Sequence, residues 1–319
     1  MKAFVVAEIG SNWEGSLSKG KRIIKECKKA GADAVKFQMW RANDLYEDSH
    51  PNWKEIKKSE LTFEKTRKFK EYCDEQKIEF FCSAFYPEAI EFLDSVNVKR
   101  HKIASRTCTF NDPYSVETIT KISDSRKPVI ISMGMGGNKN RIRKILKKNK
   151  ITFCYCISEY PTDLRKVNWK KLEKYDGFSD HTLGITAPLI FTVIKKRKNT
   201  SDIFIEKHVK LKNSKGPDAS SSINTDELKT MVEQIRIIEK AIGNEDRIIS
   251  NEEKETLKVA RKSIVSTRTL MVGDIIKRTD VCFKRPGTGF LPIDIHKVVG
   301  KKIIVEIPKD SVIKKEFLS

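Results

Sequence analysis

The sequence lacks the features that would place it in a membrane or in an oxidising compartment. Its apolar runs, such as Ile130–Ile131 and Ile203–Ile205, are short and soon interrupted, so no segment resembles a membrane span. The N-terminal MKAFVVAEIGSN has neither the long apolar stretch nor the small-residue cleavage site of a signal peptide. Seven cysteines show no zinc-type pairing, and Cys154 and Cys156 lie in a strand-like run, where we expect both as small buried hydrophobes. These absences predict a cytoplasmic protein with free thiols.

A nucleic-acid-binding signature is also missing, although the formal net charge is +20. The lysines are spread along helix-like stretches such as KGKRIIKECKKAG and RKILKKNK, without interleaved aromatic residues and without a known nucleic-acid motif. Solvated helix faces account for most of this charge, and its field would help to collect an anionic small substrate. We therefore expect no nucleic acid and no membrane as partners. A salt-sensitive affinity for oligonucleotides would favour the opposite interpretation.

One pattern repeats from residue 1 to about residue 210: a short β-branched or apolar run ends in polar residues, and a helical stretch follows it. Alternating β and α elements predict a parallel sheet, and eight such units predict a closed (β/α)₈ barrel. An open doubly wound sheet is the alternative, but no G-x-G-x-x-G follows the first run. The eight runs are Phe4–Glu8, Ala34–Gln38, Phe80–Ser83, His101–Ser105, Val129–Ser132, Thr152–Cys156, Gly177–Asp180 and Asp202–His208.

The composition changes after the eighth unit. A helical stretch, Thr225–Ile242, is followed by a polar connection, Gly243–Glu255, and then by strand-like pieces broken by Gly and Pro. These pieces, SIVSTRTLM, VCFKRPGTGF and KKIIVEIPKD, predict a small, mostly β domain with a loop at Arg285–Gly289. We expect two domains, with residues 1–245 forming the barrel and residues 246–319 forming the linker and the small domain.

Polar side chains end nearly every expected strand, at the edge where barrels of this kind carry their active sites. The residues are Glu8, Ser11, Asn12, Lys36, Gln38, Ser83, Lys102, Ser105, Ser132, Ser158, Tyr160, Ser179, Asp180, His181, Glu206, Lys207 and His208. A single Ser or Lys at a strand end is more often a cap or a solvated residue than a catalyst. Their convergence on one rim is harder to explain in that way and predicts a functional site.

Two subsets of these residues have a chemical interpretation of their own. His181 and His208 end neighbouring strands, and two neutral imidazoles suit a divalent transition metal acting as a Lewis acid, although a hydrogen-bonded structural pair is the alternative. Two ammonium groups among hydroxyls form a cradle for phosphate or carboxylate, namely Lys36, Lys102, Ser83, Ser105 and Ser132. Arg285, next to Pro286 and a flexible Gly-Thr-Gly, is a further candidate for a carboxylate clamp.

Nine segments together resemble the ordered motifs of the sialic acid synthase family, which includes the synthases of neuraminic, legionaminic and pseudaminic acids. The segments are AEIGSNWEGS, AVKFQ, KIAS, PVIISMGM, CISEYPT, FSDHTLG, IEKHV, GPDASSS and KRPGTG, and they extend over essentially the whole chain. The resemblance implies a TIM barrel followed by a small antifreeze-protein-like (SAF) domain. It also implies a domain-swapped homodimer, in which Arg285 enters the site of the partner and holds the N-acyl group of the sugar.

The resemblance implies site roles as well. Phosphate and carboxylate binding falls to Lys36, Ser83, Lys102, Ser105, Ser132, Ser158 and Ser179, with Gln38 beside them, and a divalent ion, usually Mn²⁺ with Mg²⁺ or Co²⁺ as alternatives, to His181 and His208. Glu8, Tyr160, Glu206 and Asp218 would surround the sugar and its open-chain aldehyde. The chain departs from the family at Trp13, where the family usually has His, and at Thr107, where a Glu is common. We expect both departures to alter the sugar side of the site.

The expected function is the condensation of phosphoenolpyruvate with an N-acylated hexosamine, giving a nine-carbon 2-keto-3-deoxy acid and phosphate. A different or phosphorylated aldose is the nearest alternative, for which Lys207, Arg106 and Lys215 are the candidate rim cations. A catalytically weakened sugar-binding paralogue is the alternative from another class, suggested by Trp13 and Thr107.

Overall fold

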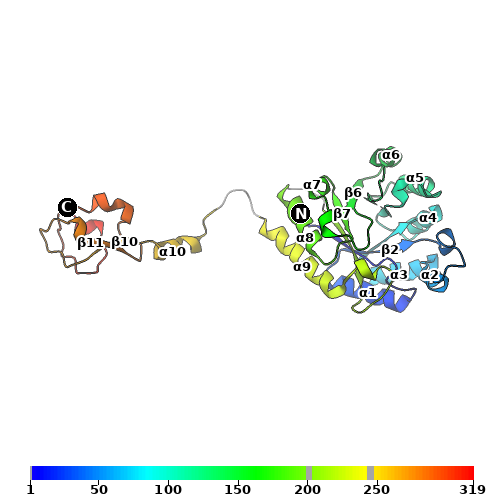
Figure 1. The fold of residues 1–319 in the computed structure, drawn as a ribbon, viewed down its shortest axis with the longest axis horizontal. Helices are drawn as coiled ribbons and strands as arrows, with labels where there is room; N and C mark the ends of the chain where they lie inside the picture. The colour runs from blue at the N-terminus through cyan, green and yellow to red at the C-terminus, as the bar shows by residue number, and fades with distance from the viewer. Residues whose placement is uncertain (1, 199–202, 243–247) are drawn as a thin grey trace. The chain divides into compact units, whose positions relative to one another are not determined.

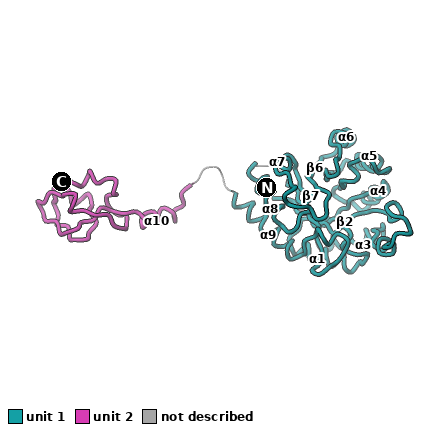
Figure 2. Tube along the Cα trace, viewed as in Figure 1, with its two compact units in different colours: residues 1–243 teal, residues 244–319 magenta. Residues whose placement is uncertain are grey.

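The computed structural model describes residues 2–198, 203–242 and 248–319. The chain divides into two compact units, residues 1–243 and residues 244–319 (Figure 2). The expected boundary at residues 245 and 246 lies outside the described residues. Among the helices of the described ranges, none has the length and apolar content needed to cross a bilayer.

Eight parallel strands form a closed barrel in the first unit. The strands follow one another around the barrel in chain order, and β1 pairs with both β2 and β8, which closes the sheet and excludes the doubly wound alternative. The strands are β1 Phe4–Glu8, β2 Ala34–Met39, β3 Glu79–Ala84, β4 His101–Ile103, β5 Val129–Ser132, β6 Ile151–Cys156, β7 Gly177–Asp180 and β8 Phe204–Lys210, and β9, Ile223–Asn224, extends from β8. The expected fold class is confirmed.

Helices surround the strands of the barrel (Figure 1). Side-chain caps begin several of them: Ser16 accepts from the Lys19 amide, and Asn224 forms a capping box with Glu227. The helices are α1 Leu17–Lys29, α2 Trp53–Ser59, α3 Phe63–Glu75, α4 Pro87–Ser95, α5 Ser115–Ser125, α6 Lys139–Ile145, α7 Trp169–Leu172, α8 Thr186–Arg197 and α9 Thr225–Ala241. The apolar faces of these helices and the outward-facing strand residues form the main hydrophobic core.

The ends of two expected strands were wrong. The fourth strand stops at Ile103, because the chain turns into a 3₁₀ helix, Thr107–Thr109, instead of continuing through Ser105. The eighth begins at Phe204 and continues to Lys210, where β9 pairs with its end. The expected start of that strand at Asp202 lies outside the described residues.

The second unit contains less β structure than expected. Among its described residues, 248–319, the sheet consists of β10, Ser263–Ser266, and β11, Val281–Lys284. The third expected piece contributes isolated bridges such as Leu270–Ile307 instead of a strand. The expected polar connection was also wrong beyond residue 250, since Ser250 and Glu253 form a capping box that begins helix α10, Asn251–Ala260. The part of the connection at residues 243–247 lies outside the described residues. A small apolar core holds this unit together.

Candidate functional site

The inside of the barrel has two layers that come from the same strands. Because side chains two residues apart point to the same face of a strand, each strand places one inward residue deep in the barrel and another nearer its carboxyl end. The deep layer is apolar and consists of Val6, Ala34, Phe81, Ile130, Cys154 and Phe204. Two residues further along each of these strands, the upper layer is polar and contains Glu8, Lys36, Ser83, Ser132, Cys156 and Glu206. Lys102 of β4 joins this layer through its contacts with Ser132 and Glu206. The polar layer is the floor of the candidate site.

Ion pairs connect the floor from one side of the barrel to the other. Lys36 Nζ lies 2.6 Å from Glu8 Oε2 and donates to Ser83 Oγ at 2.9 Å. Lys102 Nζ donates to Ser132 Oγ at 2.7 Å and lies 3.4 Å from Glu206 Oε1. These six side chains are at most 5% exposed. Two ammonium groups and their hydroxyl partners are therefore held ready in a site with little water.

Glu206 is the central carboxylate of this floor. It accepts from Ser179 Oγ at 2.8 Å, and Lys36 Nζ lies 3.9 Å from its second oxygen. Burial acts to raise the pKa of Glu206, but Lys102 and Lys36 outweigh it and lower that pKa to about 2. Burial likewise opposes the charge of Lys102, yet the pKa of Lys102 is raised because Glu206 lies beside it. Glu206 and Lys102 therefore remain charged at neutral pH.

Ser105 and Ser158 lie around a glycine next to this floor. Ser105 Oγ accepts from the Gly134 amide at 3.1 Å, and a Cβ at Gly134 would lie 2.4 Å from Ser158 Oγ and 2.7 Å from Ser105 Oγ. Only glycine leaves room for both hydroxyls here. Gln38 completes the polar rim by donating to Glu8 Oε1 at 2.7 Å. The structure thus brings together every cradle residue that the sequence predicted in the barrel.

The two histidines also meet, as expected from neighbouring strands. The ring centroids of His181 and His208 are 5.4 Å apart, and the Tyr160 ring lies 4.2 Å from that of His181. Burial, with His208 adding to it, lowers the pKa of His181 to about 3, so this imidazole is neutral. His181 Nδ1 lies 2.7 Å from the Ile157 carbonyl oxygen and therefore carries the proton, which leaves Nε2 as the free nitrogen.

The histidine pair fits a divalent cation in its chemistry. His208 Nδ1 is buried without a hydrogen-bond partner among the described residues, and the Ile157 carbonyl orients His181 as an outer partner orients a metal-bound imidazole. No group of three or more His, Cys, Asp or Glu side chains with suitable spacing occurs in the described ranges. Two imidazoles would leave the remaining positions to water and substrate oxygens.

Asp218 lies next to His208 on the segment that follows β8. Its Oδ2 accepts from the Ser11 amide at 2.8 Å and lies 3.9 Å from His208 Nδ1. A Cβ at Gly10 would lie 2.5 Å from that oxygen, and the φ of Gly10 is +52°. Only glycine permits this approach without strain, so Gly10 allows Asp218 and His208 to come together.

Asn12 is a site-supporting residue whose role the sequence did not predict. It is fully buried and donates to the Val209 carbonyl at 3.0 Å and to Ser222 Oγ at 2.9 Å. Ser222 Oγ in turn donates to the Asp218 carbonyl at 2.6 Å. The loop after β1 is thereby tied to the segment that carries Asp218. The sequence showed that Asn12 comes directly after a strand, but it did not show that the Asn12 side chain points inward.

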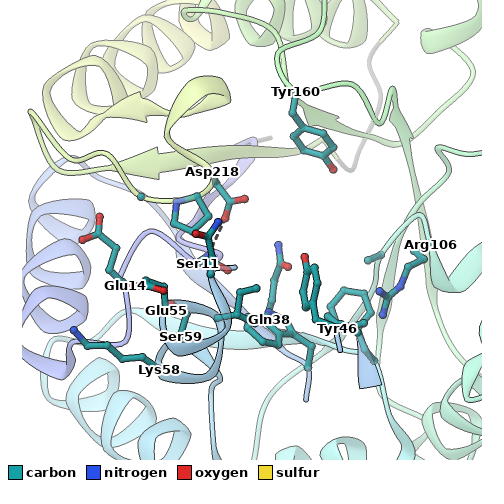
Figure 3. Close-up of a pocket in the computed structure, with 18 of the residues that line it drawn as sticks. Ser11, Glu14, Gln38, Tyr46, Glu55, Lys58, Ser59, Arg106, Tyr160 and Asp218 are labelled. Atoms are coloured by element: carbon teal, nitrogen blue, oxygen red, sulfur yellow. Dashed lines mark hydrogen bonds between the residues drawn. The ribbon is translucent and has the colours of Figure 1, made fainter. Parts of the chain in front are cut away.

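Above the floor opens a pocket of about 900 Å³, whose walls come mainly from the loops after the strands (Figure 3). Its lining includes the expected Gln38, Ser105, Ser158, Tyr160 and Asp218. The sequence did not predict the long wall that residues 40–59 provide between β2 and α3. The wall residues are Trp40, Leu45, Tyr46, His50, Asn52, Glu55, Ile56, Lys58 and Ser59.

Three residues that we expected to matter for the sugar side do not line the pocket. Trp13 is 1% exposed and packs edge-on against Phe69 at 5.4 Å between ring centroids, so it belongs to the core and not to the pocket. Thr107 is also buried and does not line the pocket. Lys207 is not a rim cation, because it is fully buried and paired with Asp180 at 2.7 Å. Arg106 and Lys215 do line the pocket, whereas Arg285 lies in the second unit.

Known proteins share both units of this chain. The NeuB family matches residues 23–247, and the SAF domain matches residues 261–319. An uncharacterised protein of Methanocaldococcus jannaschii is 34% identical, with 97% of this chain and 93% of that protein covered. The N,N′-diacetyllegionaminic acid synthase of Legionella pneumophila is 31% identical, with 96% of this chain and 92% of that protein covered.

The solved structures agree with this assignment. The N-acetylneuraminic acid (sialic acid) synthetase of Leptospira borgpetersenii matches with a TM-score of 0.69 and 26% identity. The match covers 81% of this chain and 90% of that chain. The family match includes the strands that carry the floor from Lys36 to Glu206 and both histidines. The chain therefore belongs to the NeuB family and carries a C-terminal SAF domain.

Proposed function

We propose that the chain condenses phosphoenolpyruvate with the open-chain form of an N-acylated hexosamine, giving a nine-carbon 2-keto-3-deoxy acid and inorganic phosphate. The observation that carries the proposal is the pair of buried ammonium groups, Lys36 and Lys102, at the floor of the site, together with the pair of His181 and His208. The ammonium groups suit an anionic donor, and the histidine pair suits an ion that acts on an aldehyde, and this reaction needs both. The named relatives are synthases of sugar acids.

Phosphoenolpyruvate binds at the floor in this proposal. Lys36 and Lys102 pair with its phosphate and carboxylate, and Ser83, Ser132, Ser105, Ser158 and Ser179 donate hydroxyl hydrogen bonds. Glu8 and Glu206 already hold the two ammonium groups in place, so little reorganisation is needed when the anion enters. Fixing both reactants in one cleft removes much of the entropic barrier.

His181 and His208 would hold a divalent ion, which we propose to be Mn²⁺, with Mg²⁺ or Co²⁺ able to replace it. When bound, such an ion supplies Lewis-acid stabilisation of negative charge on the aldehyde oxygen. Tyr160, next to His181, and Asp218, next to His208, orient the hydroxyls of the sugar. This leaves the aldehyde carbon facing the enol carbon of phosphoenolpyruvate.

The bond changes follow from this placement. The enol carbon attacks the aldehyde carbon, and the aldehyde oxygen becomes the hydroxyl of the product after protonation. Water then adds to the cationic C2 of the former phosphoenolpyruvate, guided by Glu8, which takes its proton. Phosphate leaves with its bridging oxygen by C–O cleavage, and a ketone remains at C2.

The SAF domain and the compartment complete the proposal. Arg285 would clamp the N-acyl group of a sugar bound in the partner of a domain-swapped homodimer, because a guanidinium at the tip of a glycine-flanked loop suits an acyl oxygen. The reaction would take place in the cytoplasm, since all seven cysteines are free thiols.

Phosphate release from phosphoenolpyruvate tests the function directly. The purified chain is assayed with Mn²⁺ against N-acetylmannosamine, its 6-phosphate and 2,4-diacetamido hexoses, with a sugar-free sample as the control. Release that depends on one of these sugars, with the keto acid identified by mass spectrometry, is the expected result. Release without sugar, or none from folded protein with any of them, would contradict the proposal and favour a weakened sugar-binding paralogue.

A further inference from the structure

A buried ion pair joins the two strands that lead to the histidines. Asp180 is the last residue of β7, and Lys207 is its partner on β8, with Asp180 Oδ2 and Lys207 Nζ 2.7 Å apart. Both side chains are fully buried. Because side chains alternate along a strand, this pair points away from the barrel interior, which the preceding Ser179 and Glu206 face. No step of the proposed reaction uses the pair.

Each member of this pair directly precedes one of the histidines. Asp180 comes before His181, and Lys207 comes before His208. Since the ion pair joins cross-strand partners at this position, it holds together the two stretches of main chain from which the imidazoles extend. His208 Nδ1 has no hydrogen-bond partner among the described residues, so the placement of that ring depends on the main chain of β8.

Thr182 connects the ion pair to the turn after β7. Asp180 Oδ1 accepts from the Thr182 amide at 2.9 Å, and Asp180 Oδ2 accepts from Thr182 Oγ1 at 3.1 Å. Lys207 Nζ donates to the Thr182 carbonyl. The Thr162 amide donates to the His181 carbonyl at 2.9 Å. The main chain is therefore held both at His181 and at the residue after it.

Stability alone does not explain why two charges are buried here. The cost of removing both charges from water largely offsets their mutual attraction. Apolar residues of similar volume in place of such a pair often give a protein that is equally stable or more stable. The best-attested use of buried polar groups is to fix which parts of a structure lie opposite each other. The position of this pair, one residue before both histidines, gives it that use at the metal site.

We propose that Asp180 and Lys207 are positioning residues that set the separation of His181 and His208 and so preorganise them for a divalent cation. The pair acts through the main chain of β7 and β8 and through Thr182, and neither side chain contacts the cation or a substrate. The inference rests on the proposed function, because the proposed function assigns the metal to these histidines. Without the pair, the imidazoles gain freedom to move and the affinity for the cation falls.

The test is the Mn²⁺ affinity of the full-length protein, measured by electron paramagnetic resonance and by calorimetry without substrates. Asp180→Leu/Lys207→Met replaces the pair with apolar side chains and leaves the net charge unchanged, so any loss of affinity reflects geometry. Asp180→Asn/Lys207→Gln is the conservative variant, because it keeps groups that can bond to Thr182. Glu79→Leu/Arg100→Met is the matched control, since Arg100 Nε pairs with Glu79 Oε1 at 2.5 Å where β3 and β4 begin, at the other end of the barrel.

We expect the apolar variant to bind Mn²⁺ roughly 10–100-fold more weakly, as is usual when an outer partner of a metal ligand is removed. Its urea midpoint should equal or exceed that of the wild type, because the pair is not needed for stability. The conservative variant should lose less affinity, and the control should bind Mn²⁺ as the wild type does. The KM for phosphoenolpyruvate should stay within about twofold in all variants, since the cradle is untouched.

Two results would overturn the inference directly. One is wild-type Mn²⁺ affinity in the apolar variant, or an equal loss of affinity in the control. The other is a loss of affinity together with a lower urea midpoint, which would make the role of the pair structural. If the apolar variant does not fold, the conservative variant decides by the same two measurements: weaker Mn²⁺ binding at an unchanged midpoint supports the inference, and wild-type affinity overturns it.

The remaining outcomes separate this inference from the proposed function. If the wild type turns over no sugar but its Mn²⁺ binding depends on the pair, the proposed function fails and the positioning role stands. If the wild type condenses a sugar and the apolar variant binds Mn²⁺ equally well, the function stands and the positioning role fails. A wild type that binds no Mn²⁺ would overturn the positioning role together with the metal assignment, while phosphate release would still test the condensation.

Discussion

The two layers inside the barrel differ in chemistry although the same strands build them. The deep layer packs Phe81, Ile130 and Phe204 and has no charged group, whereas the layer above it holds Lys36, Lys102 and Glu206. The apolar layer closes the barrel below the charged groups, so water cannot reach them from that side. A shift of two positions along one strand is therefore enough to move from the structural layer to the functional one. We expect substitutions to follow this division, and the predictions below test it.

The largest effect should come from the histidine pair above the floor. His208→Ala and His181→Ala should each lower kcat/KM by about 10³-fold or more, since Lewis-acid stabilisation is worth several kcal/mol. Manganese affinity, measured by electron paramagnetic resonance, should fall in parallel, while circular dichroism should stay unchanged. Two fully active variants would show that the metal assignment is wrong.

The next effect concerns an ammonium group of the upper layer. Lys102→Ala should lower kcat/KM by roughly 10²–10³-fold, because it removes a preorganised cation and leaves Glu206 short of one partner. Lys121→Ala is the matched control, since Lys121 is a half-buried lysine of α5 that pairs with Glu91 of α4 away from the barrel floor. The division into layers fails if both variants lose activity equally.

The sequence predicted most of this division, for a physical reason. Alternation of side chains along a strand placed Lys36, Lys102 and Glu206 on a common rim, and adjacent strand ends brought His181 and His208 together. The sequence could not predict which carboxylate pairs with which lysine, because the register between strands depends on tertiary packing.

Features outside the strands were harder to predict. The wall at residues 40–59 has no strand end to mark it, so Tyr46 was missed. Trp13 was misplaced because one residue decides whether a side chain in a turn faces the pocket or the core. The helix at Asn251–Ala260 carried a readable signal, since Ser250 and Glu253 have the spacing of a capping box.

A substitution in the deep layer should lower stability and leave activity nearly unchanged, unlike the substitutions in the upper layer. Phe81→Leu should lower the free energy of unfolding by roughly 1–2 kcal/mol, because a fully buried ring is replaced by a smaller side chain. Activity at low temperature should remain close to that of the wild type. Urea unfolding and phosphate release, measured on the same preparation, check both parts. A large loss of activity without a loss of stability would contradict the structural role of this layer.

The smallest effect gives the sharpest comparison, since β6 places one cysteine in each layer. Cys154 is fully buried among the apolar residues, whereas Cys156 accepts from Ser105 Oγ at 3.4 Å and lies 3.9 Å from His181 Nδ1. Cys154→Ala should lower the free energy of unfolding by about 1 kcal/mol and leave kcat/KM unchanged. Cys156→Ala should cost less stability but reduce kcat/KM a few-fold, because Ser105 and His181 lose a neighbour that helps to fix them. Since the two substitutions remove the same atom from the same strand, equal effects on activity would mean that the layers do not divide structure from function.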